Sequence, residues 1–182
     1  MPRIILLNGN GSAGKSSIAK ALQTITAAPF LHVSMDAFLD MMPPSLFAGP
    51  DGMVFRKTEE DGKPLVEITV GPSAARVLRG MRHAMAAMAR QGNNLIVDDV
   101  MLDNDAAEYA EAFAGLTVHW VGVFAPLDAL EERERARGDR DIGLSRWLAR
   151  HVHKGIKYDL ELDTSRAGPA ECAERIKQAF GL

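Results

Sequence analysis

The sequence has few features of secreted, membrane-spanning or nucleic-acid-binding proteins. Its 182 residues include one cysteine, Cys172, so no disulfide can form within the chain. The formal net charge is −3, so no overall positive field attracts nucleic acid or a membrane surface. The four apolar residues after Met1-Pro2-Arg3 are too few for a signal peptide, and no apolar run reaches membrane length. We therefore expect a cytoplasmic protein with neither a nucleic-acid nor a membrane partner.

The chain does have the composition of an ordinary globular protein, with 47% hydrophobic and 25% charged residues. A chain of this length fits one domain, residues 1–182, with a substantial core. Apolar runs alternate with stretches of helical spacing, which predicts an α/β fold with a parallel five-stranded sheet. The predicted strands are 4–7, 30–33, 95–97, 118–124 and 160–162, and the predicted helices are 15–27, 73–91, 105–114, 127–138, 142–155 and 170–180.

A complete phosphate-binding pattern, G-x-x-x-x-G-K-[ST], follows the first predicted strand. In such a loop the backbone N–H groups and the N-terminus of the following helix point at the phosphates. Lys15 is expected to reach the outer phosphates and the Ser16 hydroxyl to contact Mg²⁺. A chance glycine-rich turn explains neither the strand before the motif nor the helix after it. The nucleotide-binding residues predicted here are Gly9, Asn10, Gly11, Ser12, Ala13, Gly14, Lys15, Ser16 and Ser17.

This loop makes the fold class more specific. The sequence predicts a three-layer P-loop NTPase fold of the nucleotide-kinase type, with ATP and Mg²⁺ as cofactors. In an open parallel sheet the ligand binds at the carboxyl ends of the strands, so the residues that follow each strand are the candidates for chemistry.

Asp36 comes directly after the second predicted strand. A carboxylate at this position can accept the proton of a substrate hydroxyl as that hydroxyl attacks the γ-phosphoryl group, or can orient the hydroxyl. Asp is also a good helix N-cap, here for residues 37–39, and the two roles are compatible. We assign Asp36 to catalysis.

Two carboxylates, Asp98 and Asp99, end the apolar run 95–97. Paired acids at the end of a buried strand are costly unless a cation meets them, which favours a Mg²⁺ site over a plain N-cap or loop carboxylate. Because the strand is continuously apolar, its pattern does not show which of the two faces the metal. We assign Asp98, with Ser16, to Mg²⁺ and leave Asp99 near the substrate.

An arginine-rich segment follows the fourth predicted strand. If a helix runs through it, Arg133, Arg137 and Arg140 share one face, as suits a lid of about residues 131–157 that closes over a triphosphate. A solvated helix with Glu–Arg pairs is the other interpretation. We assign Arg137 and Arg140 to stabilising charge on the transferred phosphoryl group and Arg133 to the nucleotide, whose adenine is expected near Thr164.

The segment 49–70 differs from the rest because Gly, Pro, Asp and Lys dominate it. Two short β-type runs, 53–55 and 66–70, flank a polar turn at Asp61-Gly62, which predicts a β-hairpin insertion. Whether this hairpin caps the substrate or only covers the surface stays open. A histidine metal site is not expected, and His153 is expected to hydrogen-bond within the segment leading to Tyr158.

On these residues the sequence resembles the chloramphenicol phosphotransferase family of P-loop kinases. The resemblance covers nearly the whole chain, and it implies ATP-dependent O-phosphorylation of a small hydroxylated molecule with Asp36 as the base. In the founding case that molecule is chloramphenicol, phosphorylated on its primary hydroxyl, an activity that confers antibiotic resistance. The insertion is longer and more charged than expected of the founding enzyme. The most specific matching stretches are Ala136-Arg137-Gly138-Asp139-Arg140, His153-x-Gly155, Tyr158-Asp159 and Asp163-Thr164.

Three other functions stay open on sequence alone. A zeta-toxin-like kinase would phosphorylate a nucleotide-sugar. A nucleotide-gated switch would hydrolyse the nucleotide without an acceptor, although the Asn-Lys-x-Asp motif that reads guanine is missing. A non-catalytic module would bind ATP and transfer nothing. The sequence does not predict the oligomeric state.

Overall fold

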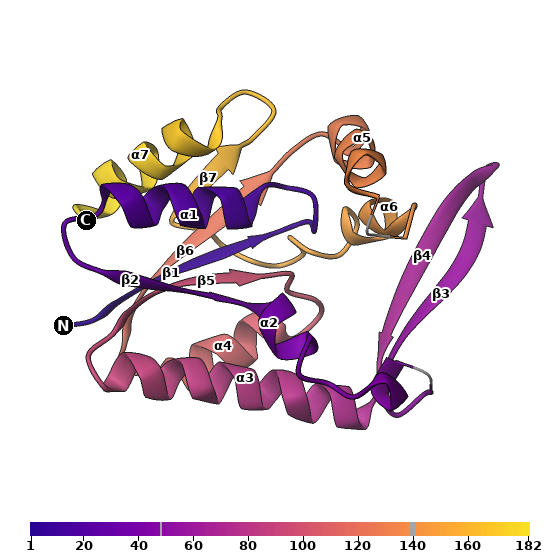
Figure 1. Cartoon of the computed structure of the whole chain (residues 1–182), viewed down its shortest axis with the longest axis horizontal. Helices are drawn as coiled ribbons and strands as arrows, with labels where there is room; N and C mark the ends of the chain where they lie inside the picture. The colour runs from indigo at the N-terminus through magenta and orange to yellow at the C-terminus, as the bar shows by residue number, and fades with distance from the viewer. Residues whose placement is uncertain (48, 139–140) are drawn as a thin grey trace.

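The computed structural model describes residues 1–47, 49–138 and 141–182. Five parallel strands form a central sheet, which confirms the predicted α/β fold (Figure 1). Their order is β2-β5-β1-β6-β7. β1, at the centre, pairs with β5 on one side and with β6 on the other. The strands are β1 (Arg3–Gly9), β2 (Phe30–Ser34), β5 (Asn94–Asp99), β6 (Thr117–Phe124) and β7 (Leu160–Asp163).

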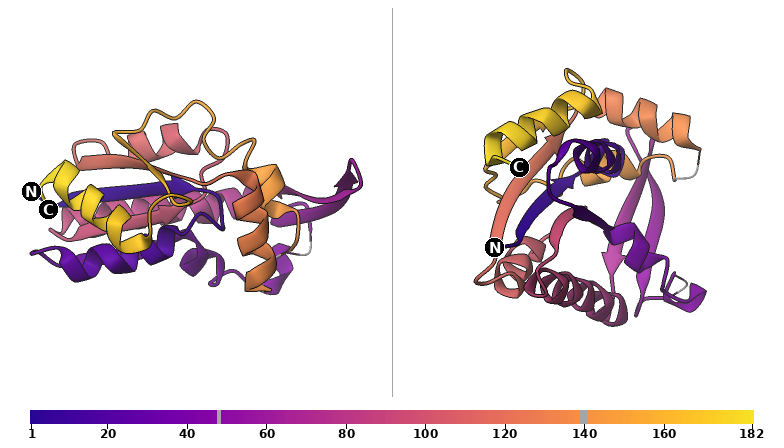
Figure 2. Two further views of the ribbon diagram at one scale, coloured as in Figure 1. Left: turned by 90° about the horizontal axis from the view of Figure 1, so that it is seen from above. Right: turned by 60° about the vertical axis from the view of Figure 1, so that its left-hand side comes forward.

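Helices cover both faces of this sheet, so the fold has three layers (Figures 1 and 2). Because side chains alternate along a strand, Ile4 and Leu6 of β1 pack in one core and Ile5 and Leu7 in the other. The first core is closed by α3 (Pro72–Arg90) and α4 (Asp105–Ala112), and the second by α1 (Lys15–Ile25) and α7 (Pro169–Phe180). Burial on both faces explains why the strands read as continuous apolar runs.

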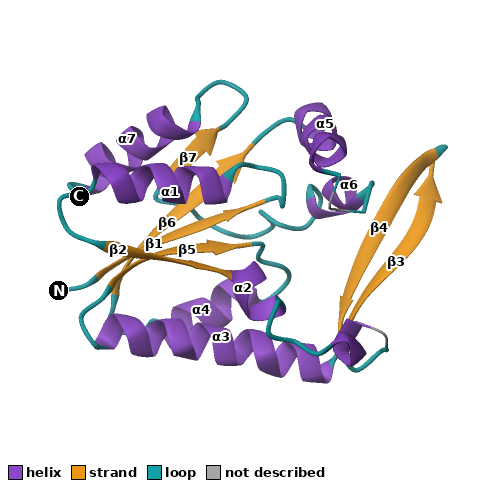
Figure 3. Cartoon of the chain, viewed as in Figure 1, coloured by secondary structure: helices purple, strands orange, loops and turns teal. Residues whose placement is uncertain are grey.

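The insertion is a β-hairpin, as predicted, but its strands are longer than the apolar runs indicated. β3 (Met53–Glu60) pairs with β4 (Lys63–Val70) through eight residue pairs, and the hairpin projects away from the sheet (Figure 3). The turn residues Asp61 and Gly62 both have positive φ, 51° and 72°. This geometry suits a two-residue hairpin turn. The charged outer halves of the strands hid their β character from the sequence analysis.

Four short helical elements lie at or near the carboxyl end of the sheet. Their bounds are α2 (Met35–Leu39), the 3₁₀ helix η1 (Pro44–Phe47), α5 (Leu127–Arg137) and α6 (Leu144–Leu148).

Of the two helices predicted in this region, one is confirmed and one is too long. The helix predicted over 142–155 is regular only over α6, and the chain continues in turns in which the Val152 amide still donates to the Leu148 carbonyl at 2.9 Å. The Val152 carbonyl accepts from Asn8 Nδ2 at 2.6 Å, and Gly155 has φ 73°, which is not helical. The helix predicted over 127–138 is α5, which ends at Arg137 with Gly138 as a left-handed C-cap at φ 69°. The shared arginine face required a helix that continued to Arg140, and α5 ends before it. Arg140 lies outside the described residues.

We predict opposite effects for two Gly→Ala substitutions. At Gly9 a Cβ would lie 2.3 Å from the carbonyl oxygen of Val123 in the neighbouring strand, so Gly9→Ala should lower the free energy of unfolding by about 1–3 kcal/mol. At Gly80, inside α3, a Cβ meets nothing within 4 Å, so Gly80→Ala should raise it by about 0.5–1 kcal/mol. Urea unfolding of both variants checks this, and equal effects would contradict it.

Candidate active site

The phosphate-binding motif forms the turn between β1 and α1. Gly14 has φ 90°, a left-handed conformation that glycine adopts without strain. The Lys15 ammonium is 5% exposed and donates to the carbonyl oxygens of Gly9 and Asn10, each at 2.9 Å. The loop therefore wraps around its own lysine, with the N-terminus of α1 behind it.

Asp98, at the end of β5, faces this loop. Its Oδ2 accepts a hydrogen bond from Ser16 Oγ at 2.6 Å, and its Oδ1 lies 3.6 Å from Lys15 Nζ. Burial opposes ionisation of this carboxyl, but Lys15 and the hydrogen-bonding neighbours outweigh burial and hold the pKa of Asp98 below its ordinary value. Asp98 is thus an anionic oxygen donor beside the serine hydroxyl.

His32, on β2, was missed by the sequence analysis. Its Nε2 lies 3.5 Å from Asp98 Oδ2. Only the pairing of β2 with β5 brings these two residues together, because they are 66 positions apart in the chain.

Asp99 points away from the loop, into the layer of α3 and α4. It accepts hydrogen bonds from the Tyr109 hydroxyl at 2.5 Å and from the Val100 amide at 2.7 Å. Burial raises the pKa of Asp99 to about 6. Asp99 lines the small void described below together with Asp36, but not the large cavity, and its place near a substrate stays a prediction. The sequence pattern does not distinguish Asp98 from Asp99, because both are buried at the end of a strand that is buried on both faces.

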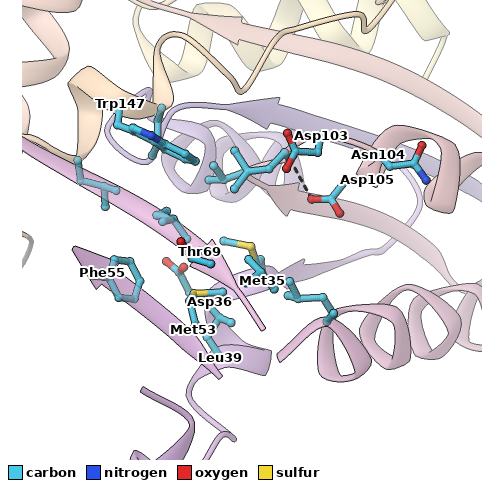
Figure 4. A pocket seen from close by; sticks show the side chains of 18 of the residues that line it. Met35, Asp36, Leu39, Met53, Phe55, Thr69, Asp103, Asn104, Asp105 and Trp147 are labelled. Atoms are coloured by element: carbon cyan, nitrogen blue, oxygen red, sulfur yellow. Dashed lines mark hydrogen bonds between the residues drawn. The ribbon is translucent and has the colours of Figure 1, made fainter. Parts of the chain in front are cut away.

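Two voids meet at Asp36. A small one of about 20 Å³ lies between the phosphate-binding loop and the ends of β2 and β5, and Lys15, Ser16, Asp36 and Asp98 line it. A cavity of about 650 Å³ opens on the other side, where Figure 4 shows the Asp36 carboxylate projecting into it. Asp36 lies in the first turn of α2, and Ser34 rather than Asp36 is the N-cap, since its side chain accepts from the Ala37 amide at 3.3 Å.

The large cavity has mostly apolar walls, with acidic groups contributed by several elements. Met53 and Phe55 of β3 and Ile68 and Val70 of β4 line it, so the inner half of the hairpin forms one wall (Figure 4). This placement favours the cap interpretation of the insertion over a purely superficial hairpin. The charged lining residues are Asp36, Arg82, Asp103, Asp105, Glu108 and Asp141.

Arg82 is the cation among these lining residues, and acids already pair with it. It is 2% exposed, contacts Asp105 and Glu108 of α4 through its two terminal nitrogens, and stacks over the Tyr109 ring at 5.2 Å. Sequence reasoning missed this buried pairing because α3 and α4 are 26 residues apart at the contact.

Arg133 connects α5 with the loop after β7. Its guanidinium donates to Thr164 Oγ1 at 2.9 Å and to the Thr164 carbonyl at 2.8 Å, and a longer contact of 3.4 Å reaches the Ser12 carbonyl. Two residues assigned to the nucleotide region therefore lie together beside the phosphate-binding loop. Arg137, at the end of α5, is exposed and lines neither void.

A polar cluster lies beneath the loop. The Tyr158 hydroxyl accepts from Asn8 Nδ2 at 2.7 Å and lies 2.8 Å from His153 Nδ1, which confirms the expected hydrogen bond of His153. His153 also stacks on Phe124 at 3.9 Å between ring centroids. Burial, with a contribution from the nearby Lys15, lowers the pKa of His153 to about 4, and burial raises that of Tyr158 to about 12.

The phosphate-binding loop, the acid at the end of β5 and the sheet order define a P-loop protein of the kinase type. The chain belongs to the family described as chloramphenicol phosphotransferase-like protein, which it matches over residues 2–181. It is 32% identical over 184 residues to a Mycobacterium tuberculosis protein whose name gives it an unproven O-phosphotransferase activity. That match covers 98% of this chain and 82% of the relative. The chain is therefore a kinase-like phosphotransferase that acts on a small molecule.

Solved structures share the fold at low sequence identity. The Mycobacterium tuberculosis APS kinase CysC, in complex with AMPPNP and APS, has a TM-score of 0.68 at 16% identity, covering 100% of this chain and 98% of that one. The Deinococcus radiodurans tunicamycin resistance protein has a TM-score of 0.67 at 21% identity, with 100% and 97% covered. Shikimate kinase from Acinetobacter baumannii has a TM-score of 0.60 at 14% identity, with 99% and 93% covered.

The described residues contain no helix that is both long and apolar enough to cross a membrane.

The lowered pKa of His153 predicts a pH-dependent stability. Between its folded pKa of about 4 and the ordinary value of 6.5, the unfolded chain binds more protons than the folded one. The contribution of neutral His153 to the free energy of unfolding is therefore fully present above pH 6.5 and is lost as the pH falls toward 4. Urea unfolding at pH 7.5 and pH 5 should show a smaller loss for His153→Asn than for the parent.

Replacement of the exposed His83 on α3, as His83→Asn, is the matched control and should leave the loss unchanged. An identical pH dependence in the parent and in His153→Asn would contradict the assignment.

Proposed function

We propose that this enzyme transfers the γ-phosphoryl group of ATP to a hydroxyl of a small molecule held in the 650 Å³ cavity. The observation that carries the proposal is the position of Asp36, which lines both the void beside Lys15 and Ser16 and the large cavity. A hydroxyl placed at this junction would have the carboxylate on one side and the phosphate-binding loop on the other. Asp36 would accept the hydroxyl proton or aim its oxygen.

The residues around the small void fit a nucleotide with Mg²⁺. Ser16 Oγ and the Asp98 carboxylate supply hard oxygen donors beside each other, and Mg²⁺ binds through one or two such protein groups, with phosphates and water completing its shell. When bound, the metal would neutralise phosphate charge. Lys15 and the loop N–H groups would hold the phosphates, and Arg133, with Thr164, would hold the base side of the nucleotide.

The segment of about residues 131–157 would act as the lid of this site. Arg137 and Arg140 are the candidates for stabilising the transferred phosphoryl group, as fixed positive charges suit that role. Closure over the nucleotide would also exclude water, which limits hydrolysis of ATP without an acceptor.

The charges of the large cavity favour an uncharged acceptor with an apolar body. Five carboxylates line it, and its arginine already pairs with two of them. A diphosphate or sulfate group would meet like charge there, and repulsion in a partly dry cavity is costly. This argues against a nucleotide-sugar as the acceptor. Chloramphenicol, the acceptor implied by the family's founding case, fits the stated chemistry.

The acceptor is tested by measuring ADP release with Mg·ATP in the presence of chloramphenicol, other hydroxylated antibiotics and a nucleotide-sugar. Mass spectrometry of the acceptor should find one added phosphate on an uncharged alcohol and none on the nucleotide-sugar. Phosphorylation of the nucleotide-sugar alone would contradict the charge argument, and ATP hydrolysis that no acceptor stimulates would favour a switch.

The role of Asp36 predicts a separation between binding and turnover. Asp36→Asn should retain ATP binding, measured by calorimetry, and should slow phosphorylation of the acceptor by on the order of a hundredfold or more, because a general base is lost. Asp40→Asn is the matched control, since Asp40 is exposed directly after α2 and lines neither void. Full turnover in Asp36→Asn would remove this residue from the mechanism.

Replacement of the loop lysine should instead weaken nucleotide binding itself. Lys15→Ala removes a buried cation that is expected to pair with the outer phosphates, so calorimetry should show much weaker ATP binding. Circular dichroism would check that the variant folds. Undiminished ATP affinity in a folded Lys15→Ala protein would contradict the nucleotide site.

A further inference from the structure

Residues 143–145, which we call the α6 corner, contact three different parts of the molecule. Glu134 of α5 is 1% exposed and accepts hydrogen bonds from the Gly143 amide at 2.8 Å and from the Ser145 amide at 2.7 Å. A buried carboxylate with both oxygens bonded to backbone N–H groups is a strong restraint. The α6 corner therefore moves together with α5 unless these two hydrogen bonds break.

The phosphate-binding loop contacts the same corner through one side chain. Asn10 is 2% exposed, and its Nδ2 donates to the Ser145 carbonyl at 2.8 Å. Its Oδ1 faces the loop and accepts from the Ser12 amide at 3.4 Å, a long bond. One carboxamide thus connects a loop N–H group with α6.

The hairpin and the large cavity meet the corner from the other side. The Val66 amide of β4 donates to the Gly143 carbonyl at 3.2 Å, and a Cβ on Gly143 would lie 2.4 Å from the Pro64 carbonyl oxygen. Leu144, Trp147 and Leu148 of α6 line the cavity, where Figure 4 shows the Trp147 ring. The wall of the acceptor cavity is therefore attached directly to residues that the nucleotide loop holds.

We infer that Asn10 and Glu134 are positioning residues through which nucleotide binding sets the shape of the acceptor cavity. Phosphates recruit the N–H groups of the loop, and Ser12 N–H is one of them. Its transfer to a phosphate would release Asn10 Oδ1 and change the bond from Asn10 to Ser145. The α6 corner would then move Leu144 and Trp147 at the acceptor cavity, and by linkage a bound acceptor would change nucleotide affinity by the same factor as the nucleotide changes acceptor affinity.

This inference rests on the proposed nucleotide site, and its test needs no knowledge of the acceptor. Trp147 is one of two tryptophans, so the Trp120→Phe variant leaves it as the sole fluorophore of that type. Binding of the non-hydrolysable analogue AMPPNP with Mg²⁺ should change the emission of Trp147 and its quenching by acrylamide. Adding Asn10→Ala, or Glu134→Gln, should abolish that response.

Calorimetry on the same proteins separates loss of coupling from loss of binding. Glu134→Gln should bind Mg·AMPPNP within about threefold of the parent, because Glu134 lines neither void. Asn10 belongs to the loop itself, so the Trp147 response of Asn10→Ala is read at saturating Mg·AMPPNP, set by the same calorimetry. Glu132→Gln is the control on α5, since Glu132 is exposed, and it should keep the full response. Circular dichroism identifies a variant that fails to fold. Because Asn10 and Glu134 lie in different elements, a folding defect in one variant leaves the other as a test.

Three outcomes would overturn the inference. Calorimetric binding to Trp120→Phe with no change at Trp147 would show that the loop does not act on α6. A full Trp147 response in both folded variants would show that other contacts carry it. Absence of Mg·AMPPNP binding by the parent would contradict the proposed function itself, and the coupling with it.

Discussion

The close approach of the phosphate-binding loop to the end of β5 constrains the rest of the site. Lys15 and Asp98 are both buried and oppositely charged, and a buried charge without a partner is costly. β5 must therefore lie next to β1, and its last residues must end level with the loop. Once those strands are adjacent, β2 on the outer side of β5 brings His32 to Asp98 and Asp36 to the mouth of the loop.

The sequence predicted the parts of this arrangement that are encoded locally. A strand, a glycine-rich turn with Lys15, and a helix follow one another within a short stretch, and each has its own signal in periodicity or composition. The parallel five-stranded sheet was predicted, but the order of its strands was not. Asp36 was found because it stands at a strand end, where parallel sheets place their ligands.

The contacts that were not predicted join residues distant in the chain. Glu134 reads as one charge in a run of charged residues, and only the structure shows that it is buried and bonded to the α6 corner. The helix expected over 142–155 has helical spacing, but beyond α6 the chain forms turns and Gly155 has a positive φ. The Asn8 side chain bonds to the Val152 carbonyl in these turns, and the periodicity of the sequence does not record a contact between residues so far apart.

The β-hairpin has a consequence for how the acceptor can change. Its apolar inner half lines the cavity, and neither strand pairs with the central sheet. Its charged outer half pairs with residues outside the hairpin, Lys57 with Asp141 and Glu60 with Arg150. The other walls of the cavity come from the central domain, and Met35, Asp36 and Val100 line both voids. The hairpin is therefore the one wall that is an insertion, and a change in its inner side chains would reshape the cavity without a change in the sequence of the phosphate-binding loop.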